Sequence, residues 1–128
     1  MPFTQALLRG LAPDGGLYVP AAPPELGGGE PPAGGTFADT ARWAAARLLP
    51  GAMEPAVLER VVAEALDFPM PLVEVEKDTF VLELFHGPSL AFKDVGARFM
   101  ARAMAAVAAP GPTHTVLVAT SGDTGGAV

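Results

Sequence analysis

One lysine stands in a setting where its amine could act as a nucleophile. Residues 86–94 read HGPSLAFKD, and Ser89 could cap a helix from residue 89 to about residue 108, with Lys93 in its first turn. Burial and the positive end of a helix both disfavour the charged ammonium form of a lysine. Lys93 is therefore suited to form a Schiff base with an aldehyde and to carry protons. The alternative is a lysine whose head group reaches solvent along its own aliphatic stem.

The predicted helix carries an apolar stripe that begins at Lys93. The positions at helical spacing from this lysine are small or apolar: Gly96, Ala97, Met100, Ala103, Met104 and Val107. The charged residues Asp94, Arg98 and Arg102 fall on a different face, where they can pair at a spacing of four residues. We therefore expect Lys93 to point along the apolar side of its helix.

A second motif, ATSGDTGG at residues 119–126, could bind an anion, although it matches neither the Walker A pattern nor GxGxxG. Its glycines allow close backbone approach, Ser121 and Thr124 add hydroxyls, and N–H groups at a helix start face outward. Asp123 fits such a site only beside a cationic or protonated group, because a carboxylate repels an anion. An ordinary tight turn between a strand and a helix is the alternative.

Short strands and a long helix must position these two motifs. PLVEVE at 71–76 and TFVLELF at 79–85 predict a hairpin that turns at Lys77 and Asp78. Glu83, on one face of the second strand, is either solvated or lies at a sheet edge or site. After the helix, HTVLVA at 114–119 predicts a further strand, followed by the Gly-rich turn and a helix start. This order is typical of the beginning of an α/β fold with a parallel sheet flanked by helices.

The N-terminal half reads as helical. Its expected elements, in chain order, are a short helix over 3–9, a turn at 13–16, a strand-like stretch at 17–19, an exposed Pro/Gly-rich connector at 20–35, and helices over 36–49 and 54–66. Thr36 and Asp39 form a weak capping box at the start of the first long helix. Seven apolar side chains are expected to pack in the core or on an inner helix face: Phe37, Trp43, Leu48, Val57, Leu58, Val61 and Leu66.

Composition excludes several classes of function. The 128 residues are 50% hydrophobic and 17% charged, which suits one modest globular domain. The net charge of −6 and the dispersed Lys and Arg argue against a nucleic-acid partner. No apolar run is long enough to span a bilayer, no signal peptide is recognisable, and there are no cysteines, so we expect a cytoplasmic protein. The two histidines lack partners for a metal site, and we assign no metal.

The two motifs together resemble those of one enzyme family. LELFHGPSLAFKDVGARFMA at 82–101, followed by ATSGDTGGAV at 119–128, is similar to the threonine synthase family of fold type II pyridoxal 5'-phosphate (PLP) enzymes. FTQALLRGLAPDGGLYVP at 3–20 looks like the N-terminal signature of the same family. The resemblance implies an α/β fold with residues 1–79 as the family's N-terminal region and residues 80–128 as the beginning of its PLP-binding domain.

The resemblance also implies roles for individual residues. Lys93 would be the catalytic lysine that bonds covalently to the cofactor, and the remaining cofactor-binding residues would be Phe92, Ser121, Gly122, Asp123 and Thr124. Asp123 matches the position expected near the 3-oxygen of the cofactor, whereas Phe92 could equally be a core residue. Substrate-binding residues would be Ser89, Ser121 and Thr124, with Ser89 where Thr is more frequent in the family. His86 is either a loop histidine bonded to the backbone or a phosphate ligand.

The implied reaction converts O-phospho-L-homoserine and water into L-threonine and phosphate. Members of this family are several hundred residues long and hold the cofactor phosphate with a separate downstream loop, so we expect this chain to act as an N-terminal fragment with little activity alone. Two alternatives stay open: a non-catalytic interaction or dimerisation module derived from the family, and a PLP lyase for another phosphorylated amino acid. The oligomeric state is left open, since a sheet edge at the final strand could associate.

Overall fold

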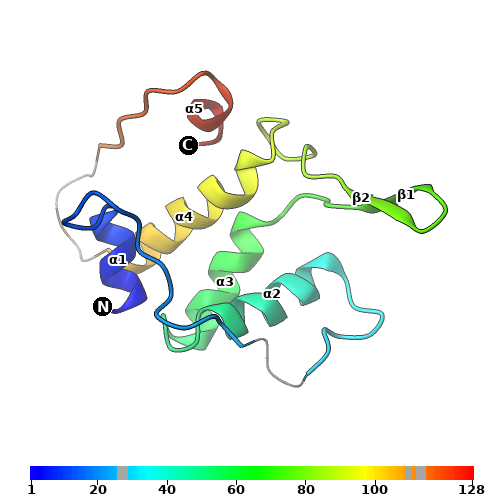
Figure 1. Cartoon of the computed structure of the whole chain (residues 1–128), viewed down its shortest axis with the longest axis horizontal. Coiled ribbons are helices and arrows are strands. Elements are labelled where there is room, and N and C mark those ends of the chain that lie inside the picture. Colours follow the sequence, from blue (N-terminus) through cyan, green and yellow to red (C-terminus); the bar gives the residue numbers. More distant parts are fainter. Residues whose placement is uncertain (26–28, 109–110, 112–114) are drawn as a thin grey trace.

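The fold is a group of helices packed around one long helix, with a hairpin that projects from it. The computed structural model describes residues 1–25, 29–108, 111 and 115–128. Its elements are α1 (Phe3–Arg9), α2 (Phe37–Leu48), α3 (Pro55–Ala65), β1 (Leu72–Glu76), β2 (Thr79–Leu82), α4 (Lys93–Val107) and α5 (Asp123–Ala127). α4 contacts α1, α3 and α5, and α2 packs on the other side of α3 (Figure 1). α4 is therefore the helix that connects the N-terminal and C-terminal parts.

The core lies between α3 and its neighbours. Its buried apolar side chains come from α3, from the segment that follows it and from α4: Leu58, Val61, Val62, Ala65, Phe68, Met70 and Ala103. Ala65 and Ala103 are fully buried, and such small side chains let two helices approach closely. The predicted core position of Leu48 is wrong, because this side chain is 45% exposed at the last residue of α2. Phe37 and Trp43 are half-buried.

The start of α2 confirms the predicted capping box. The hydroxyl oxygen of Thr36 accepts a hydrogen bond from the N–H of Asp39 at 3.3 Å. The carboxylate of Asp39 accepts in return from the N–H of Thr36 at 2.9 Å and from its hydroxyl at 2.8 Å. These bonds satisfy donors that a helix start otherwise leaves to water.

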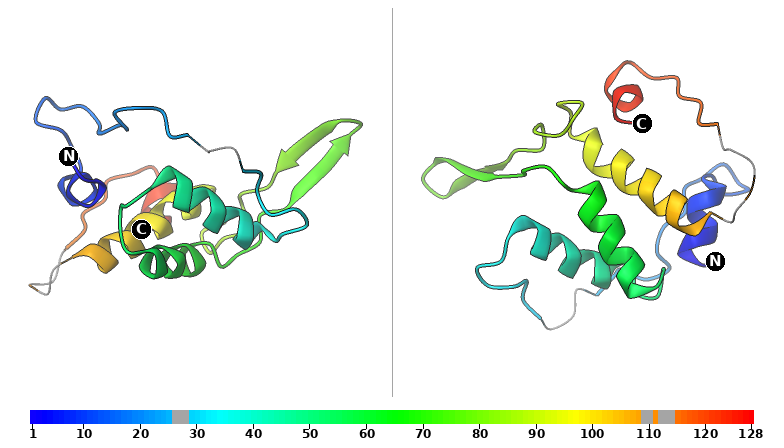
Figure 2. Two further views of the ribbon diagram at one scale, coloured as in Figure 1. Left: turned by 90° about the horizontal axis from the view of Figure 1, so that it is seen from below. Right: turned by 180° about the vertical axis from the view of Figure 1, so that it is seen from behind.

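The hairpin is confirmed, but it stands apart from the helices. β1 pairs antiparallel with β2, Val73 opposite Val81, and Lys77 and Asp78 form the turn. Asp78 has a positive φ of 61°, a backbone conformation that aspartate tolerates better than most residues. β2 ends at Leu82, three residues earlier than predicted. Figure 2 shows the hairpin extending away from the helical part, and all residues of both strands are exposed.

Two predicted strands are absent from the described residues. Residues 115–119 form no strand, and residue 114 of the predicted strand lies outside the described residues. The described sheet is therefore the two-stranded antiparallel hairpin rather than the start of a parallel sheet. A strand requires a neighbour to complete its hydrogen-bond ladder, and the hairpin lies on the opposite side of the molecule from residues 115–119 (Figure 1). Residues 17–19 contribute only an isolated bridge between Leu11 and Leu17.

The division of the chain into 1–79 and 80–128 stays a prediction, and its boundary falls inside β2. The helices over 3–9, 36–49 and 54–66 are confirmed within one or two residues at each end. None of the helices in the described ranges is both long and apolar enough to cross a bilayer.

α4 begins at Lys93, so the predicted N-cap role of Ser89 is wrong. Phe92 occupies the N-cap position without a side-chain hydrogen bond. The reason lies at Leu90, whose φ of 57° is incompatible with a right-handed helix and turns the chain between residues 87 and 92. Lys93 nevertheless lies in the first turn of the helix, as predicted.

Candidate functional site

A groove runs along the first two turns of α4. It has a volume of about 480 Å³ and is bounded by α4, by α5 and by the segment after β2. We call it the Lys93 groove, and its lining residues are Leu84, Phe92, Lys93, Val95, Gly96, Ala97, Met100, Thr124 and Val128. Besides Lys93, three of the six stripe positions predicted from the sequence line it, namely Gly96, Ala97 and Met100, so the first half of the stripe faces the groove.

Lys93 lies at the edge between this groove and solvent. It is the first residue of α4, and its side chain is half-buried. Its amine nitrogen Nζ lies 4.6 Å from the centre of the Phe92 ring, where the ring face attracts the amine. Phe92 is 59% exposed and lines the groove, so the alternative of a core phenylalanine is wrong. The ring and the amine are held together at one wall of the groove.

The Gly-rich turn leads into α5, and Thr124 of α5 lines the groove. Thr120, the second residue of the ATSGDTGG motif, accepts hydrogen bonds at its hydroxyl oxygen from the N–H groups of Gly122 at 3.2 Å and Gly125 at 3.0 Å. Gly122 has a φ of 141°, which favours glycine over any residue with a side chain. No role is predicted for Thr120 from the sequence, although a threonine near the start of a Gly-rich turn is a recognisable signal for such bonds.

The structure brings only part of the predicted set together. Thr124, the second residue of α5, lines the Lys93 groove. Ser121, Gly122 and Asp123 are exposed and do not line it. The two motifs therefore meet through Thr124, and the binding roles of all four residues stay predictions.

The first turn of α4 contains a buried charge whose partner the sequence predicts incorrectly. Asp94 is 1% exposed, and its Oδ2 accepts a hydrogen bond from the N–H of Ser89 at 2.9 Å. The predicted pairing of Asp94 with Arg98 is wrong. The guanidinium of Arg98 instead donates to the carbonyl of Ala65 at 2.9 Å and to the carboxylate of Asp67.

His86 and Glu83 form a pair at the entrance to this loop. Nε2 of His86 lies 2.6 Å from Oε2 of Glu83, and both side chains are half-exposed. Glu83 is thus partly solvated and paired with His86, and it follows the end of β2 at Leu82. Neither residue lines the Lys93 groove, and the phosphate-binding role of His86 stays a prediction.

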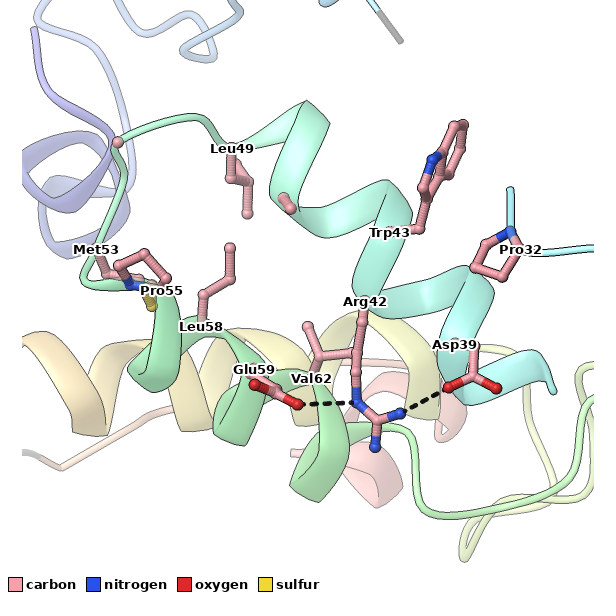
Figure 3. Close-up of a pocket in the computed structure, with 12 residues that line it drawn as sticks. Pro32, Asp39, Arg42, Trp43, Leu49, Met53, Pro55, Leu58, Glu59 and Val62 are labelled. Atoms are coloured by element: carbon pink, nitrogen blue, oxygen red, sulfur yellow. Dashed lines mark hydrogen bonds and ion pairs between the residues drawn. The ribbon is translucent and has the colours of Figure 1, made fainter. Parts of the chain in front are cut away.

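A second, larger pocket lies between α2 and α3 (Figure 3). It measures about 580 Å³, and its polar centre is Arg42, which lies 3.2 Å from Asp39 and 3.7 Å from Glu59. Because two carboxylates already neutralise this guanidinium, the pocket offers little attraction for an anion. Its lining contains no lysine, serine, threonine or histidine, and its two carboxylates are paired with Arg42, so we assign it a packing role. Within the described ranges, no group of three or more His, Asp or Glu residues could hold a metal ion.

Solved structures define the class of protein. The chain is similar to the crystal structure of threonine synthase from Escherichia coli, with a TM-score of 0.71 and 34% identity over 84% of this chain and 26% of that one. It is also similar to the PLP-bound threonine synthase from Brucella melitensis, with a TM-score of 0.64 and 40% identity over 84% of this chain and 25% of that one. The fold is therefore that of the N-terminal part of fold type II PLP enzymes, which confirms the expected α/β class.

Sequence comparison then gives the family. The family model described as "Threonine synthase N terminus" matches residues 1–66, and the chain belongs to the threonine synthase family. Threonine synthase from Haemophilus influenzae is 44% identical over 126 residues, which cover 98% of this chain and 29% of the relative. Human "Threonine synthase-like 1" is 38% identical over 136 residues, covering 98% of this chain and 18% of the relative. The chain thus spans about 30% of the length of the bacterial threonine synthases it matches.

Proposed function

We propose that this chain supplies the reactive lysine and part of the substrate site of a threonine synthase. The reaction converts O-phospho-L-homoserine and water into L-threonine and phosphate. One observation carries the proposal: Lys93 and Thr124, from two motifs far apart in the sequence, line the same groove. An inert scaffold would have no need to bring an amine and a hydroxyl to one apolar groove.

The Lys93 groove fits PLP by its chemistry. It offers an amine that can bond to the aldehyde, a hydroxyl from Thr124, and apolar walls from residues such as Phe92, Val95 and Met100 that suit a planar ring. Lys93, Phe92 and the turn over 121–124 would hold the cofactor. When bound, PLP supplies an electron sink for the charge that develops at the substrate carbons.

The residues of the chain would then have separate tasks. Nζ of Lys93 takes and returns protons at the substrate carbons, because it lies in the groove where those carbons must sit. The hydroxyls of Ser121 and Thr124 donate hydrogen bonds to the substrate carboxylate. Asp123 would lie near the 3-oxygen of the cofactor, and Ser89 would contribute to binding the substrate. Phosphate leaves from the γ-carbon, and water adds at the β-carbon.

The covalent step can be tested on the chain itself, because it contains two lysines of different environment. Lys77 lies in the exposed hairpin turn, whereas Lys93 lines the groove. We expect PLP followed by borohydride to label Lys93 well ahead of Lys77, as measured by peptide mass spectrometry. Lys93→Ala should remove the selective label, and Lys77→Ala should leave it. Equal labelling of the two lysines would overturn the proposal and favour the non-catalytic module.

Substrate choice needs a second experiment. O-phospho-L-homoserine should protect Lys93 from labelling better than L-serine or O-phospho-L-threonine does, because the site must match both a carboxylate and a terminal phosphate. Stronger protection by one of the other two compounds would favour a PLP lyase for a different amino acid.

Turnover can be measured in a chimera. This chain would replace the matching N-terminal segment of the Haemophilus influenzae threonine synthase, to which it is 44% identical. We expect the chimera to form threonine and to lose this activity with Lys93→Ala but not with Lys77→Ala. Retention of activity in the Lys93→Ala chimera would contradict the assignment of this residue.

A further inference from the structure

We propose that Asp94 is a positioning residue that fixes the loop before α4, and through it the direction of Lys93 and Ser89. This inference rests on the proposed function. It is carried by three observations on Asp94: its burial, its bond to Ser89, and its close approach to Gly87.

The burial of Asp94 requires an explanation. It is the one buried charged side chain in the part of the chain that the structure describes. Moving a carboxylate out of water is unfavourable unless hydrogen bonds compensate for the loss of hydration. Asp94 lies in the first turn of α4, where the helix dipole favours a negative charge, and Ser89 donates its N–H to the carboxylate. The carboxylate thus joins the helix start to a residue five positions earlier.

Gly87 leaves the space for this contact. A Cβ built on Gly87 would lie 2.5 Å from Oδ2 of Asp94 and 2.9 Å from its Cβ, closer than non-bonded atoms approach. Gly87 is itself buried. The glycine therefore allows the loop to pass directly over the carboxylate. Any other residue at this position would displace either the loop or the Asp94 side chain.

Ser89 extends the contact toward the site. Its hydroxyl oxygen is buried and has no hydrogen-bond partner among the described residues. A Cβ built on Gly126 of α5 would lie 3.9 Å from Cβ of Ser89, so this residue borders the helix that carries Thr124. With the N–H of Ser89 held by Asp94, its hydroxyl is the group left available for a ligand.

The consequence is a fixed relation between the loop and the lysine. Asp94 directly follows Lys93, and its bond to Ser89 closes the residues between them into a tight loop. That loop includes Leu90, whose left-handed backbone is unfavourable for a branched aliphatic residue and needs support from its surroundings. Without the bond, the loop and the first residue of α4 would adopt several conformations, and Lys93 would meet the aldehyde in fewer of them.

The test uses the ratio of labelling at Lys93 to labelling at Lys77, together with amide hydrogen exchange at Ser89 without cofactor. Asp94→Ala removes the acceptor, whereas Asp94→Asn keeps an acceptor oxygen in place without the charge. Ala101→Gly is the matched control, because it weakens α4 at an exposed position away from the loop. We expect Asp94→Ala to lower the labelling ratio on the order of tenfold or more and to expose the Ser89 amide. Asp94→Asn and Ala101→Gly should retain most of the labelling ratio and most of the protection of the Ser89 amide.

Several outcomes would overturn the proposal. The first is a Lys93-to-Lys77 labelling ratio that is unchanged in Asp94→Ala although the Ser89 amide has become exposed. The second is a fall in this ratio that is as large in Ala101→Gly as in Asp94→Ala. The third is an Asp94→Asn variant whose labelling ratio is as low as that of Asp94→Ala while its Ser89 amide stays protected. Should circular dichroism show that Asp94→Ala is unfolded, Gly87→Ala decides, since its Cβ displaces the carboxylate without removing it. If PLP labels Lys93 and Lys77 of the unmodified chain equally, the proposed function fails. Hydrogen exchange at the Ser89 amide still reports on the Asp94 contact in that case.

Discussion

At the scale of single residues, the hydrogen bonds of Asp39 link the start of α2 to pH. Its hydrogen bonds with the Thr36 side chain, and next with the Thr36 backbone, hold its pKa below the ordinary value of an aspartate, and the nearby Arg42 guanidinium acts in the same direction. A pKa that is lower in the folded state means that the ionised carboxylate stabilises the fold. This stabilisation is present above the pKa of an unfolded aspartate, about 3.9, and is lost as the pH falls through the lower folded value.

We therefore predict that Asp39→Asn destabilises the chain in a pH-dependent way. The difference in unfolding free energy between the unmodified chain and the variant should be constant above about pH 5 and shrink toward zero below the pKa of an unfolded aspartate. Urea unfolding at a series of pH values measures it. Asp14→Asn, a substitution in an exposed turn, is the control. A difference that does not change between pH 2 and pH 6 would contradict the prediction.

The residues of the site show where sequence reasoning succeeds. Lys93 could be placed on the groove because helical spacing is a local property that survives folding. Asp94 could not be placed, since its burial depends on the left-handed backbone at Leu90 and on the path of the loop over Gly87. Both features arise from the way the loop packs, which periodicity does not describe. A helical pattern that continues through residues 89–92 is misleading here because Leu90 leaves the helical region.

At the scale of elements, Arg98 joins α3 to α4. Its guanidinium donates to two carbonyls at the end of α3, those of Ala65 at 2.9 Å and Glu64 at 3.1 Å, and to the carboxylate of Asp67. It also lies 5.7 Å from the centre of the Phe68 ring. The last carbonyls of a helix lack partners within the helix, so Arg98 acts as a C-terminal cap supplied by another helix.

We predict that Arg98→Ala lowers the unfolding free energy by about 1–3 kcal/mol, because charge-assisted bonds and the packing of the side-chain stem are lost together. Arg98→Lys should recover part of this loss, since lysine retains charge but not the planar fork. Chemical denaturation measures both. Arg60→Ala, on an exposed position of α3, controls for the loss of a positive charge. An equal effect of the two alanine variants would show that the cap contributes nothing specific.

The elements also show why the described residues form no parallel sheet. Residues 115–119 have the apolar, β-branched character of a strand, which is why the sequence predicts one there, but the prediction is wrong for these residues. A strand is completed by its neighbour, however, and within the described residues no strand lies beside this segment. The β1–β2 hairpin could be predicted because its partner is only a turn away in the chain.

At the scale of the whole molecule, apolar side chains are unevenly distributed. The hairpin exposes Leu72, Val75 and Phe80, and the segment before the Gly-rich turn exposes Leu117, which is 90% accessible. Apolar side chains exposed together on one element are available to bind another polypeptide. The unpaired edges of the hairpin add free N–H and C=O groups to it.

We predict that the chain associates with itself as its concentration rises. Leu117→Glu combined with Phe80→Lys should shift it toward the monomer, because the two substitutions place charges on both exposed regions. Sedimentation velocity over a range of concentrations measures the distribution. Ala63→Glu adds a charge at an exposed position of α3 outside these regions and should have little effect. A chain that sediments as a monomer throughout would contradict the prediction.

The position of Trp43 has a practical consequence for all of these measurements. The chain contains a single tryptophan, and its indole borders the pocket between α2 and α3 and lies 4.5 Å from the guanidinium carbon of Arg47. Intrinsic fluorescence excited at the indole band therefore reports on the α2–α3 pocket, and Trp43 does not line the Lys93 groove. Emission and chemical modification can be followed in the same sample as independent signals, one for the integrity of the helical layer and one for the reactivity of the amine.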